Sequence, residues 1–272
     1  MGSGLVIPSY QNGFAPRDGP PAYPELWDGL VGLWQPTLGP TGLKLFDQSG
    51  YHRDGTLTNM DPATDWVTSP HGWALDLDGT NDYVDCGEIS FPGPVSVLFD
   101  WAGSSSSTSI GGMGGYNGTA WMLGPDEGDR VMFYALSGAS PAITGLTLGT
   151  TRHTAVGTFM PSTYVRVYLD GGTGGFAEDT SGIPVALTPD VSIKLGNRGD
   201  GTGDILGQLY RAAIWSRILL PSEIQLLHHD PHAIVRLKQR VLFASAGGAP
   251  PAPPYWMWAR QQQAQVIGGG VL

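Results

Sequence analysis

The sequence predicts an all-β fold: an antiparallel two-sheet jelly-roll sandwich with one short helix and extended arms at both ends. Of its 272 residues, 41 are glycine, which is roughly twice the usual share of about 7%. Charged residues make up 14%, against about a quarter in ordinary soluble domains. Hydrophobic residues reach 41%, enough to bury a core. Such a composition favours many short strands joined by tight turns.

The strands themselves are predicted from short, regularly spaced segments in which apolar and polar residues alternate. Residues 73–78, for example, read Trp-Ala-Leu-Asp-Leu-Asp, so that one face is buried and the other is wetted. The predicted strands, in order, cover residues 30–34, 73–78, 82–84, 95–101, 130–136, 154–159, 164–169, 191–195 and 209–215.

The connections agree with this fold class. Asp170-Gly171-Gly172 predicts a hairpin turn, because glycine takes a positive φ without strain. Only residues 221–229 predict a helix, in which Leu220, Ile224 and Leu227 recur at helical spacing. No alternation of strand and helix occurs, so a parallel sheet is not expected.

Three regions of the chain differ in composition and in residue pattern. Residues 1–28 are rich in proline and glycine and predict an extended arm; residues 29–243 carry the strand pattern. Residues 244–272 begin with a proline-rich linker and continue into an aromatic tail. Exposed aromatic side chains are costly unless a partner buries them. We therefore expect the tail to mediate assembly through Tyr255, Trp256 and Trp258.

The middle region resembles the laminin-G-like, concanavalin A-like lectin/glucanase jelly rolls. Residues 77–84, Leu-Asp-Gly-Thr-Asn-Asp-Tyr-Val, are similar to the "F-D-G-x-x-D-Y-V" strand-turn-strand of that family. Residues 164–171 resemble its "v-x-l-Y-v-D-G" hairpin, and residues 207–229 its closing strand and helix. Asp47-Gln48-Ser49-Gly50 followed by Gly55-Thr56-Leu57 matches its early "D-x-S-G…G-t-l" stretch. The resemblance implies the jelly-roll fold. It does not select a function, because this fold hosts lectins, hydrolases and adhesive modules.

One position departs from the family pattern. Its members often carry an acidic pair after "G-x-l", where this chain has Tyr210 and Arg211. Any metal-binding role at these two positions is therefore in question.

The charge of the chain narrows its partners. A net charge of -10 is opposite to the basic face that nucleic-acid binding requires. No stretch approaches the roughly 20 apolar residues that span a bilayer. The first residues show no basic segment followed by an apolar run, so we expect no secretion signal there. The single Cys86 is interpreted as a small core residue.

Calcium is the metal that the acidic loops suit. Asp47, Asp78, Asn81 and Asp82 offer hard oxygen ligands on loops that the fold could bring together. The alternative, which we weigh more heavily, is that these side chains shape turns by bonding backbone N–H groups. A weaker second set, Asn197, Asp200 and Asp204, has the same alternative.

A glycan is the other candidate ligand. Tyr116, Asn117 and Trp121 lie among glycines, and aromatic rings with amides are the groups that bind sugars. The alternative for Trp121 is a place in the core.

Catalysis is not expected. Glucanases of this fold use two carboxylates on one strand, but the sequence has no Glu-x-Asp-x-Glu run. Asp76 and Asp78 share a strand face, where paired aspartates are usually just solvated. Residues 228–232, His-His-Asp-Pro-His, suggest a transition-metal site, yet adjacent histidines on a helix point apart.

These observations predict a non-enzymatic binding or structural protein. Because of the two arms, we expect a phage virion component, either a capsid decoration or a tail protein, that is a homo-oligomer or part of a larger assembly. The alternative is a bacterial cell-surface carbohydrate-binding module, with calcium as a candidate cofactor. A third interpretation is a glycoside hydrolase whose site the sequence does not reveal.

Overall fold

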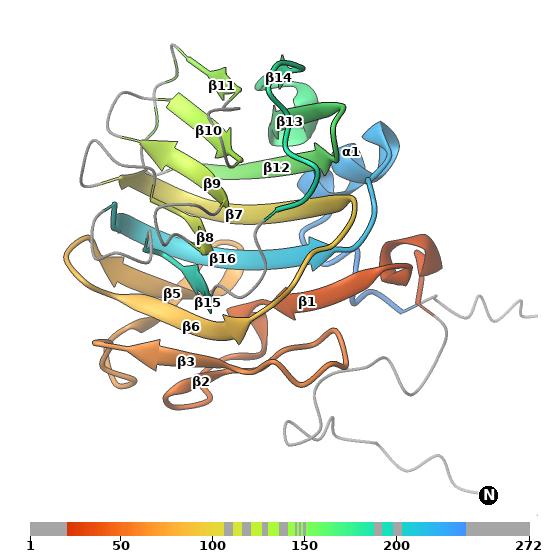
Figure 1. Cartoon of the computed structure of the whole chain (residues 1–272). Coiled ribbons are helices and arrows are strands. Elements are labelled where there is room, and N and C mark those ends of the chain that lie inside the picture. The colour runs from red at the N-terminus through yellow and green to blue at the C-terminus, as the bar shows by residue number, and fades with distance from the viewer. Residues whose placement is uncertain are drawn as a thin grey trace, which may run out of the picture. The chain divides into compact units, whose positions relative to one another are not determined.

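The fold is described from a computed structural model. It covers residues 21–105, 111–115, 121–126, 130–135, 141–144, 146, 148, 151–187, 192–197 and 203–237. Within these residues two antiparallel sheets of eight strands each face one another (Figure 1). The predicted two-sheet, all-β sandwich is confirmed.

The first sheet places strands in an order unlike that of the chain. From one edge to the other its strands are β14 (Gly175–Asp179), β13 (Tyr164–Leu169), β12 (Arg152–Met160), β7 (Val95–Ser105), β16 (Ile205–Trp215), β5 (Gly72–Asp78) and β4 (Trp66–Ser69). The eighth strand, β1 (Leu30–Trp34), pairs with the second half of β16, beyond the part that pairs with β5.

The second sheet is built in the same antiparallel manner. Its order is β11 (Ala142–Ile143), β10 (Arg130–Tyr134), β9 (Trp121–Asp126), β8 (Met113–Gly115), β15 (Ser192–Leu195), β6 (Tyr83–Glu88), β3 (Gly55–Thr58) and β2 (Lys44–Leu45).

Helices are few among the described residues. The α-helix α1 spans Pro221–His229, and short 3-10 turns cover η2 (Pro24–Trp27), η3 (Pro36–Leu38) and η5 (Asp170–Gly172). Proline at the first position of α1 supplies a preset φ where no backbone donor is needed. The Glu223 carboxylate accepts the Leu220 N–H at 2.7 Å and so caps the helix. None of the described helices has the length and apolar character needed to cross a membrane.

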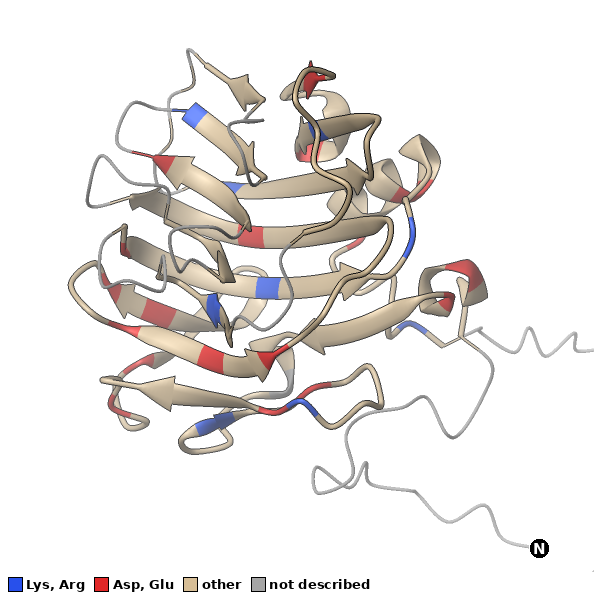
Figure 2. Ribbon diagram, viewed as in Figure 1, with Lys and Arg blue, Asp and Glu red and all other residues tan. Residues whose placement is uncertain are grey.

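The main core lies between the sheets. Alternate residues of each strand point into it, for example Val97, Phe99 and Trp101 from β7 and Leu123 from β9. The charged residues are thinly spread over the strands (Figure 2). Burying this apolar surface, at roughly 25 cal/mol per Å², is the main stabilising contribution.

A second apolar cluster covers half of the outer face of the first sheet. Leu98 and Trp215 point outward from β7 and β16 and pack beneath Ile224 and Leu227 of α1. Leu26 of η2 is fully buried in the same cluster. The other half of this face, which begins at Ala102 and Tyr210, carries a small cluster, and no helix of the described residues packs on that cluster.

The N-terminal boundary differs from the expected one. The predicted arm of residues 1–28 includes η2, and the indole N–H of Trp215 donates to the Leu26 carbonyl at 2.8 Å. Residues 21–28 therefore belong to the sandwich, because Leu26 is fully buried in the second apolar cluster. The sequence periodicity does not reveal this packing. Pro21 also pairs with Leu237 in an isolated bridge, so the two ends of the described region meet.

Candidate functional site

A groove of about 490 Å³ lies on the uncovered half of the first sheet's outer face. Three strand segments line it, residues 76–78 of β5, 102–104 of β7 and 206–208 of β16. We call this cavity the outer groove. Asp76, Asp78 and Leu206 are exposed there, with Leu206 54% accessible to solvent. Because a large apolar side chain stands beside carboxylates, the groove offers two kinds of contact to a ligand.

Strand periodicity explains which side chains reach the outer groove. In β5, Leu75 and Leu77 are buried in the core while Asp76 and Asp78 are exposed. The period of two thus places both carboxylates on the outer face, as the alternation predicted. In β16, Leu206 and Gln208 take the equivalent outward positions opposite β5.

A pair of glycines lets β7 and β16 meet in the outer groove. Gly103 and Gly207 face each other across the strands, with φ of +131° and +142°. A Cβ at Gly103 would collide with the Leu206 carbonyl oxygen, and one at Gly207 with that of Ala102. Glycine is the residue that readily adopts this mirror-image extended backbone. Both positions therefore need a glycine.

Hydrogen bonding orients one polar group of the groove, the Gln208 amide, and burial changes the pKa of another, Asp76. The Tyr210 hydroxyl donates to Gln208 Oε1 at 2.7 Å, which directs the amide nitrogen of Gln208 away as a donor for a ligand. Burial, and then the nearby carboxylate of Asp65, raises the pKa of Asp76. A more basic carboxylate accepts hydrogen bonds more strongly.

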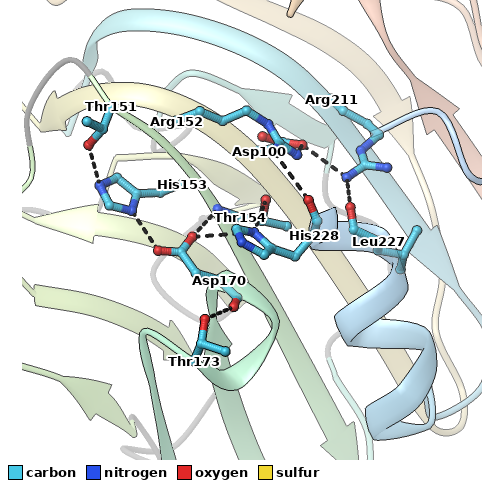
Figure 3. A network of polar contacts seen from close by, with 10 residues as sticks. All are labelled: Asp100, Thr151, Arg152, His153, Thr154, Asp170, Thr173, Arg211, Leu227 and His228. Atoms are coloured by element: carbon cyan, nitrogen blue, oxygen red, sulfur yellow. Dashed lines mark hydrogen bonds and ion pairs between the residues drawn. The ribbon is translucent and has the colours of Figure 1, made fainter. Parts of the chain in front are cut away.

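A network of polar contacts fastens α1 to the first sheet (Figure 3). Asp100 is fully buried, and its Oδ2 accepts from Arg152 and, at 3.0 Å, from Arg211. Arg211 also donates to the Leu227 carbonyl at 2.7 Å and to the Pro231 carbonyl at 2.9 Å. Its guanidinium therefore joins the sheet to the last turn of the helix, where cations are favoured.

Asp170 holds the neighbouring part of the same network. Its two oxygens lie 3.0 Å from His153 Nδ1 and 3.8 Å from His228 Nδ1, and it accepts the Thr154 N–H at 2.9 Å. Burial acts to raise the pKa of Asp170, but the bonds from His153 and Thr154 outweigh it and lower that pKa. The carboxylate thus stays charged and orders the end of α1.

Thr151, His153 and Asp170 form a hydroxyl–imidazole–carboxylate series, with Thr151 Oγ1 3.2 Å from His153 Nε2. That order is the one used in nucleophilic catalysis. Here the carboxylate is shared with α1 and with a backbone N–H, and these three residues do not line the outer groove. We interpret the series as part of the network that secures α1.

Comparison with solved structures identifies the architecture. A domain of an extracellular arabinanase from Geobacillus stearothermophilus, solved with arabinotriose, matches 73% of this chain and 98% of its own, with a TM-score of 0.57 at 18% identity. Trypanosoma rangeli sialidase in complex with sialic acid matches 77% of this chain with a TM-score of 0.54 at 17% identity. The chain has a lectin/glucanase-like β-sandwich fold.

Other similarities are to parts of larger proteins. The binding domain of botulinum neurotoxin DC, in complex with SialylT, matches with a TM-score of 0.52 at 12% identity. The match spans 52% of that toxin chain and 34% of the sialidase chain. No protein-family model and no curated protein matches the sequence. The likeness is therefore one of fold, as the sequence resemblance implied.

In this lectin-like sandwich, the residues predicted to bind calcium form turns. Asp47 is fully buried and accepts the N–H groups of Leu33, Ser49 and Arg53 at 3.0, 2.8 and 3.0 Å. Asp78 accepts the Thr80 N–H at 2.7 Å. These bonds are the turn-forming ones that were the alternative to a metal.

The other predicted ligands behave similarly. Asp82 Oδ2 accepts the Asp78 N–H at 3.1 Å, and the Asn81 carbonyl accepts from Asn59 at 2.9 Å. Asn197 donates to Asp204, and Asp200 lies outside the described residues. Among the residues that the structure describes, no three acidic, histidine or cysteine side chains are grouped to hold a metal ion.

The predicted glycan-binding residues are not brought together by what is described. Trp121 is fully buried and packs edge-on against Phe91 and Phe133, with ring centroids 5.9 and 6.2 Å apart. Its ring fills the core and presents no face to a sugar, which corrects the prediction for this residue. Tyr116 and Asn117 lie outside the described residues, as do Tyr255, Trp256 and Trp258 of the tail.

The sequence reasoning missed Ser104, Leu206 and Gln208 as groove residues. They come from two strands that are about a hundred positions apart and meet only in the folded sheet. The one available signal was the pair Gly103 and Gly207, each standing within an otherwise strand-like segment. A glycine inside a strand marks a close approach of the backbone.

Proposed function

We propose that this chain is a non-catalytic carbohydrate-binding sandwich and that the outer groove is its binding surface. The observation that carries the proposal is the combination of Asp76, Asp78 and Gln208 with the exposed Leu206 in one cavity of about 490 Å³. Sugars present hydroxyl groups beside patches of C–H, and sites that bind them combine oriented polar groups with apolar side chains.

Each group in the groove has a role in this proposal. The carboxylates of Asp76 and Asp78 accept hydrogen bonds from sugar hydroxyls, and charged acceptors form the stronger bonds. The Gln208 amide, oriented by Tyr210, donates to a ring or hydroxyl oxygen. Leu206 packs against the C–H face of a ring. The glycine pair allows β7 and β16 to approach closely at the floor of the groove.

The solved neighbours support this proposal. The arabinanase domain was solved with arabinotriose, the sialidase with sialic acid and the toxin binding domain with SialylT. Proteins with this fold thus bind saccharides. The groove's residues, rather than the fold, are what extend that property to this chain.

An array of neutral and acidic oligosaccharides, followed by calorimetry on the best binder, tests the proposal. Asp76→Asn and Gln208→Ala are expected to weaken binding about tenfold each, which is about 1.4 kcal/mol. Asp28→Asn is the matched control, because that carboxylate is largely exposed and lies on η2's side of the molecule, away from the groove. Absence of binding across the array would overturn the proposal.

The non-catalytic part is tested separately. Retaining glycosidases of this fold use two carboxylates on one strand as catalytic groups. Asp76 and Asp78 both lie on β5 and line the outer groove. A reducing-sugar assay on the bound polysaccharide is expected to show no release above the rate of the Asp76→Asn, Asp78→Asn double variant. Release that the double variant abolishes would reassign the chain as a hydrolase.

We further propose that the sandwich is displayed on a phage virion, with a bacterial cell surface as the alternative setting. The support is the composition of the segments that flank the sandwich. Both are rich in proline and glycine, and residues 244–272 contain Tyr255, Trp256 and Trp258. Aromatic side chains are frequent anchors of protein interfaces. The described segments that lead to them, at Pro21 and Leu237, lie side by side.

Light scattering of full-length protein and of a variant lacking residues 250–272 tests the assembly role. The truncated chain lacks Tyr255, Trp256 and Trp258, so we expect it to form smaller assemblies in light scattering. Its circular dichroism spectrum is expected to remain that of a strand-rich protein. Unchanged assembly after truncation would remove the tail as an anchor.

A further inference from the structure

A second cavity, of about 590 Å³, lies next to the outer groove on the same side of the first sheet. One wall is the β4–β5 turn with His71. The other is the end of α1 and the segment that follows it, with His229, His232 and Arg236. We call it the histidine pocket. Three imidazoles and one guanidinium around an open cavity are hydrogen-bond donors to an anion.

Guanidinium groups lie in and behind the wall of the histidine pocket, in a chain that is strongly acidic overall. Behind it lies Arg211, which donates to the carbonyl of Pro231 in the pocket wall. Burial lowers the pKa of His232, and the guanidinium groups of Arg211, Arg236 and Arg152 lower it further, while Asp230 opposes them. Several positive groups therefore act on this cavity, although the net charge of the chain is -10.

The one carboxylate in the pocket wall is already engaged. Asp230 Oδ1 accepts from Arg236 Nη2 at 2.8 Å and from the His232 N–H at 3.1 Å. The carboxylate thus orders the segment after α1 rather than facing a ligand alone. Arg236 remains about half exposed and keeps further donors for a second partner.

The histidines of residues 228–232 do not form a metal site. No group of three potential ligands is close enough among the described residues, and the side chains line a cavity far larger than a metal ion. His229 and His232 instead stand across the cavity from His71, which comes from a distant part of the chain. The arrangement fits a molecule with an anionic group, not an ion shared by its ligands.

The histidine pocket is physically joined to the outer groove through Tyr210. The ring of His71 stands edge-on to Tyr210, with centroids 5.5 Å apart, and the Tyr210 hydroxyl donates to Gln208 in the groove. Tyr210 itself is 7% exposed and lines neither cavity. It links the two from beneath, because His71 lines the pocket and Gln208 lines the groove.

We propose that the histidine pocket binds the carboxylate of an acidic sugar, so that the ligand of this sandwich is an anionic glycan. The proposal rests on the carbohydrate-binding function proposed above. In it, Arg236, His229 and His232 donate to the carboxylate of one unit. Asp76, Asp78 and Gln208 bind hydroxyls of the next units. An anion is most strongly held by a guanidinium with additional N–H donors.

Histidine side-chain NMR of the full chain tests the pocket directly. Glucuronate and glucose form the matched pair of probes, because they differ only in the carboxylate, and acetate tests for an anion without a sugar. Glucuronate is expected to shift the imidazole signals of His71, His229 and His232. Glucose is expected to leave them in place, and acetate to act at least about tenfold more weakly than glucuronate.

Variants assign the effect to the pocket. Arg236→Gln and His232→Gln are expected to weaken glucuronate binding about tenfold each. Arg166→Gln, which removes a guanidinium from the β13–β14 edge of the same sheet, is the matched control and leaves it unchanged. Circular dichroism of each variant confirms that it folds.

The outcomes separate the two proposals. Unshifted histidines with glucuronate, or shifts that survive Arg236→Gln, overturn the histidine pocket even where neutral oligosaccharides bind in the outer groove. Equal effects of acetate and glucuronate overturn the sugar part of the inference. Failure of every oligosaccharide on the array overturns the proposed function, a result read from a different experiment.

Discussion

Arg211 and Asp100 form an ion pair across β16 and β7, with 3.0 Å between Nη2 and Oδ2 and both side chains buried. Arg211 occupies the place where the resembled family often carries an acidic residue. Its guanidinium pairs with Asp100 and donates to the last carbonyls around α1. The residue at which this sequence departs from the family pattern, Arg211, is thus the one that attaches α1 to the sheet.

Replacing Arg211 tests the strength of this attachment. Arg211→Ala leaves the Asp100 carboxylate buried with less compensation, and we expect it to lower the free energy of unfolding by about 3–5 kcal/mol. Arg166→Ala, which breaks a half-exposed pair with Glu178, should cost no more than about 1 kcal/mol. Urea denaturation measures both. A loss for Arg211→Ala no greater than that of the control would show that the pair does not secure α1.

The pH dependence of stability follows from His228 and His232. Burial is the largest cause that lowers the pKa of each from its ordinary 6.5. Because the unfolded chain then binds protons more readily than the folded one, stability is full above pH 6.5 and falls as the pH drops below it. Urea midpoints at pH 7.5, 6.5 and 5.5 should decrease in that order.

His232→Gln provides the control for that pH dependence. It removes one of the two groups, so its midpoints should change less between pH 7.5 and 5.5 than those of the wild type. Asp170 does not confuse this window, because its pKa lies below its ordinary 3.8 and its contribution is lost only at more acid pH. A pH profile of the variant parallel to that of the wild type would contradict the assignment to His232.

Replacing Asp47 distinguishes a turn-forming role of this residue from a calcium-binding one. Since its oxygens accept three backbone N–H groups and the Ser49 hydroxyl, Asp47→Ala should lower the free energy of unfolding by about 2–4 kcal/mol. With a turn alone, EDTA or millimolar calcium leaves the melting temperature of the wild type where it was. A calcium-dependent rise that Asp47→Ala abolishes would establish the metal site instead.

Gly207 is expected to tolerate no side chain. Gly207→Ala forces a Cβ onto the Ala102 carbonyl oxygen at a φ of +142°, and should cost about 2–3 kcal/mol and weaken oligosaccharide binding in the outer groove. Gly50→Ala is the control, since its φ of +93° is also positive but no atom lies within 4 Å of the added Cβ. The difference between the two in thermal unfolding measures the collision itself. Equal losses would show that only backbone strain matters.

Much of the fold was predictable because its strands carry local signals. The strand of residues 164–169 was predicted with its observed bounds, as its alternation ends at the glycine turn that forms η5. The helix of residues 221–229 was marked by its proline and its apolar spacing. By contrast β8, Met113–Gly115, is short and mostly glycine, so no periodicity revealed it.

The candidate site was less predictable, because its parts come from distant segments. Asp76 and Asp78 were seen to share a face, but that face becomes a groove only when β7 and β16 lie beside β5. His71 and His232 are far apart in the sequence and line one cavity only in the folded chain. For Trp121 the sequence allowed two interpretations, a place in the core or a glycan-binding role. A tryptophan beside glycines fits both locally, and its burial in the folded structure assigns it to the core.

The bridge between Pro21 and Leu237, supported by the Ala22 N–H on the Arg236 carbonyl at 2.7 Å, has a consequence for how such a unit is accommodated in larger chains. A folded unit whose ends are adjacent occupies no more room at its attachment point than a hairpin loop does. It is suited to insertion as a guest within a surface loop of a host protein, whose own fold would not be pulled apart, and to circular permutation by a short link between residues 237 and 21.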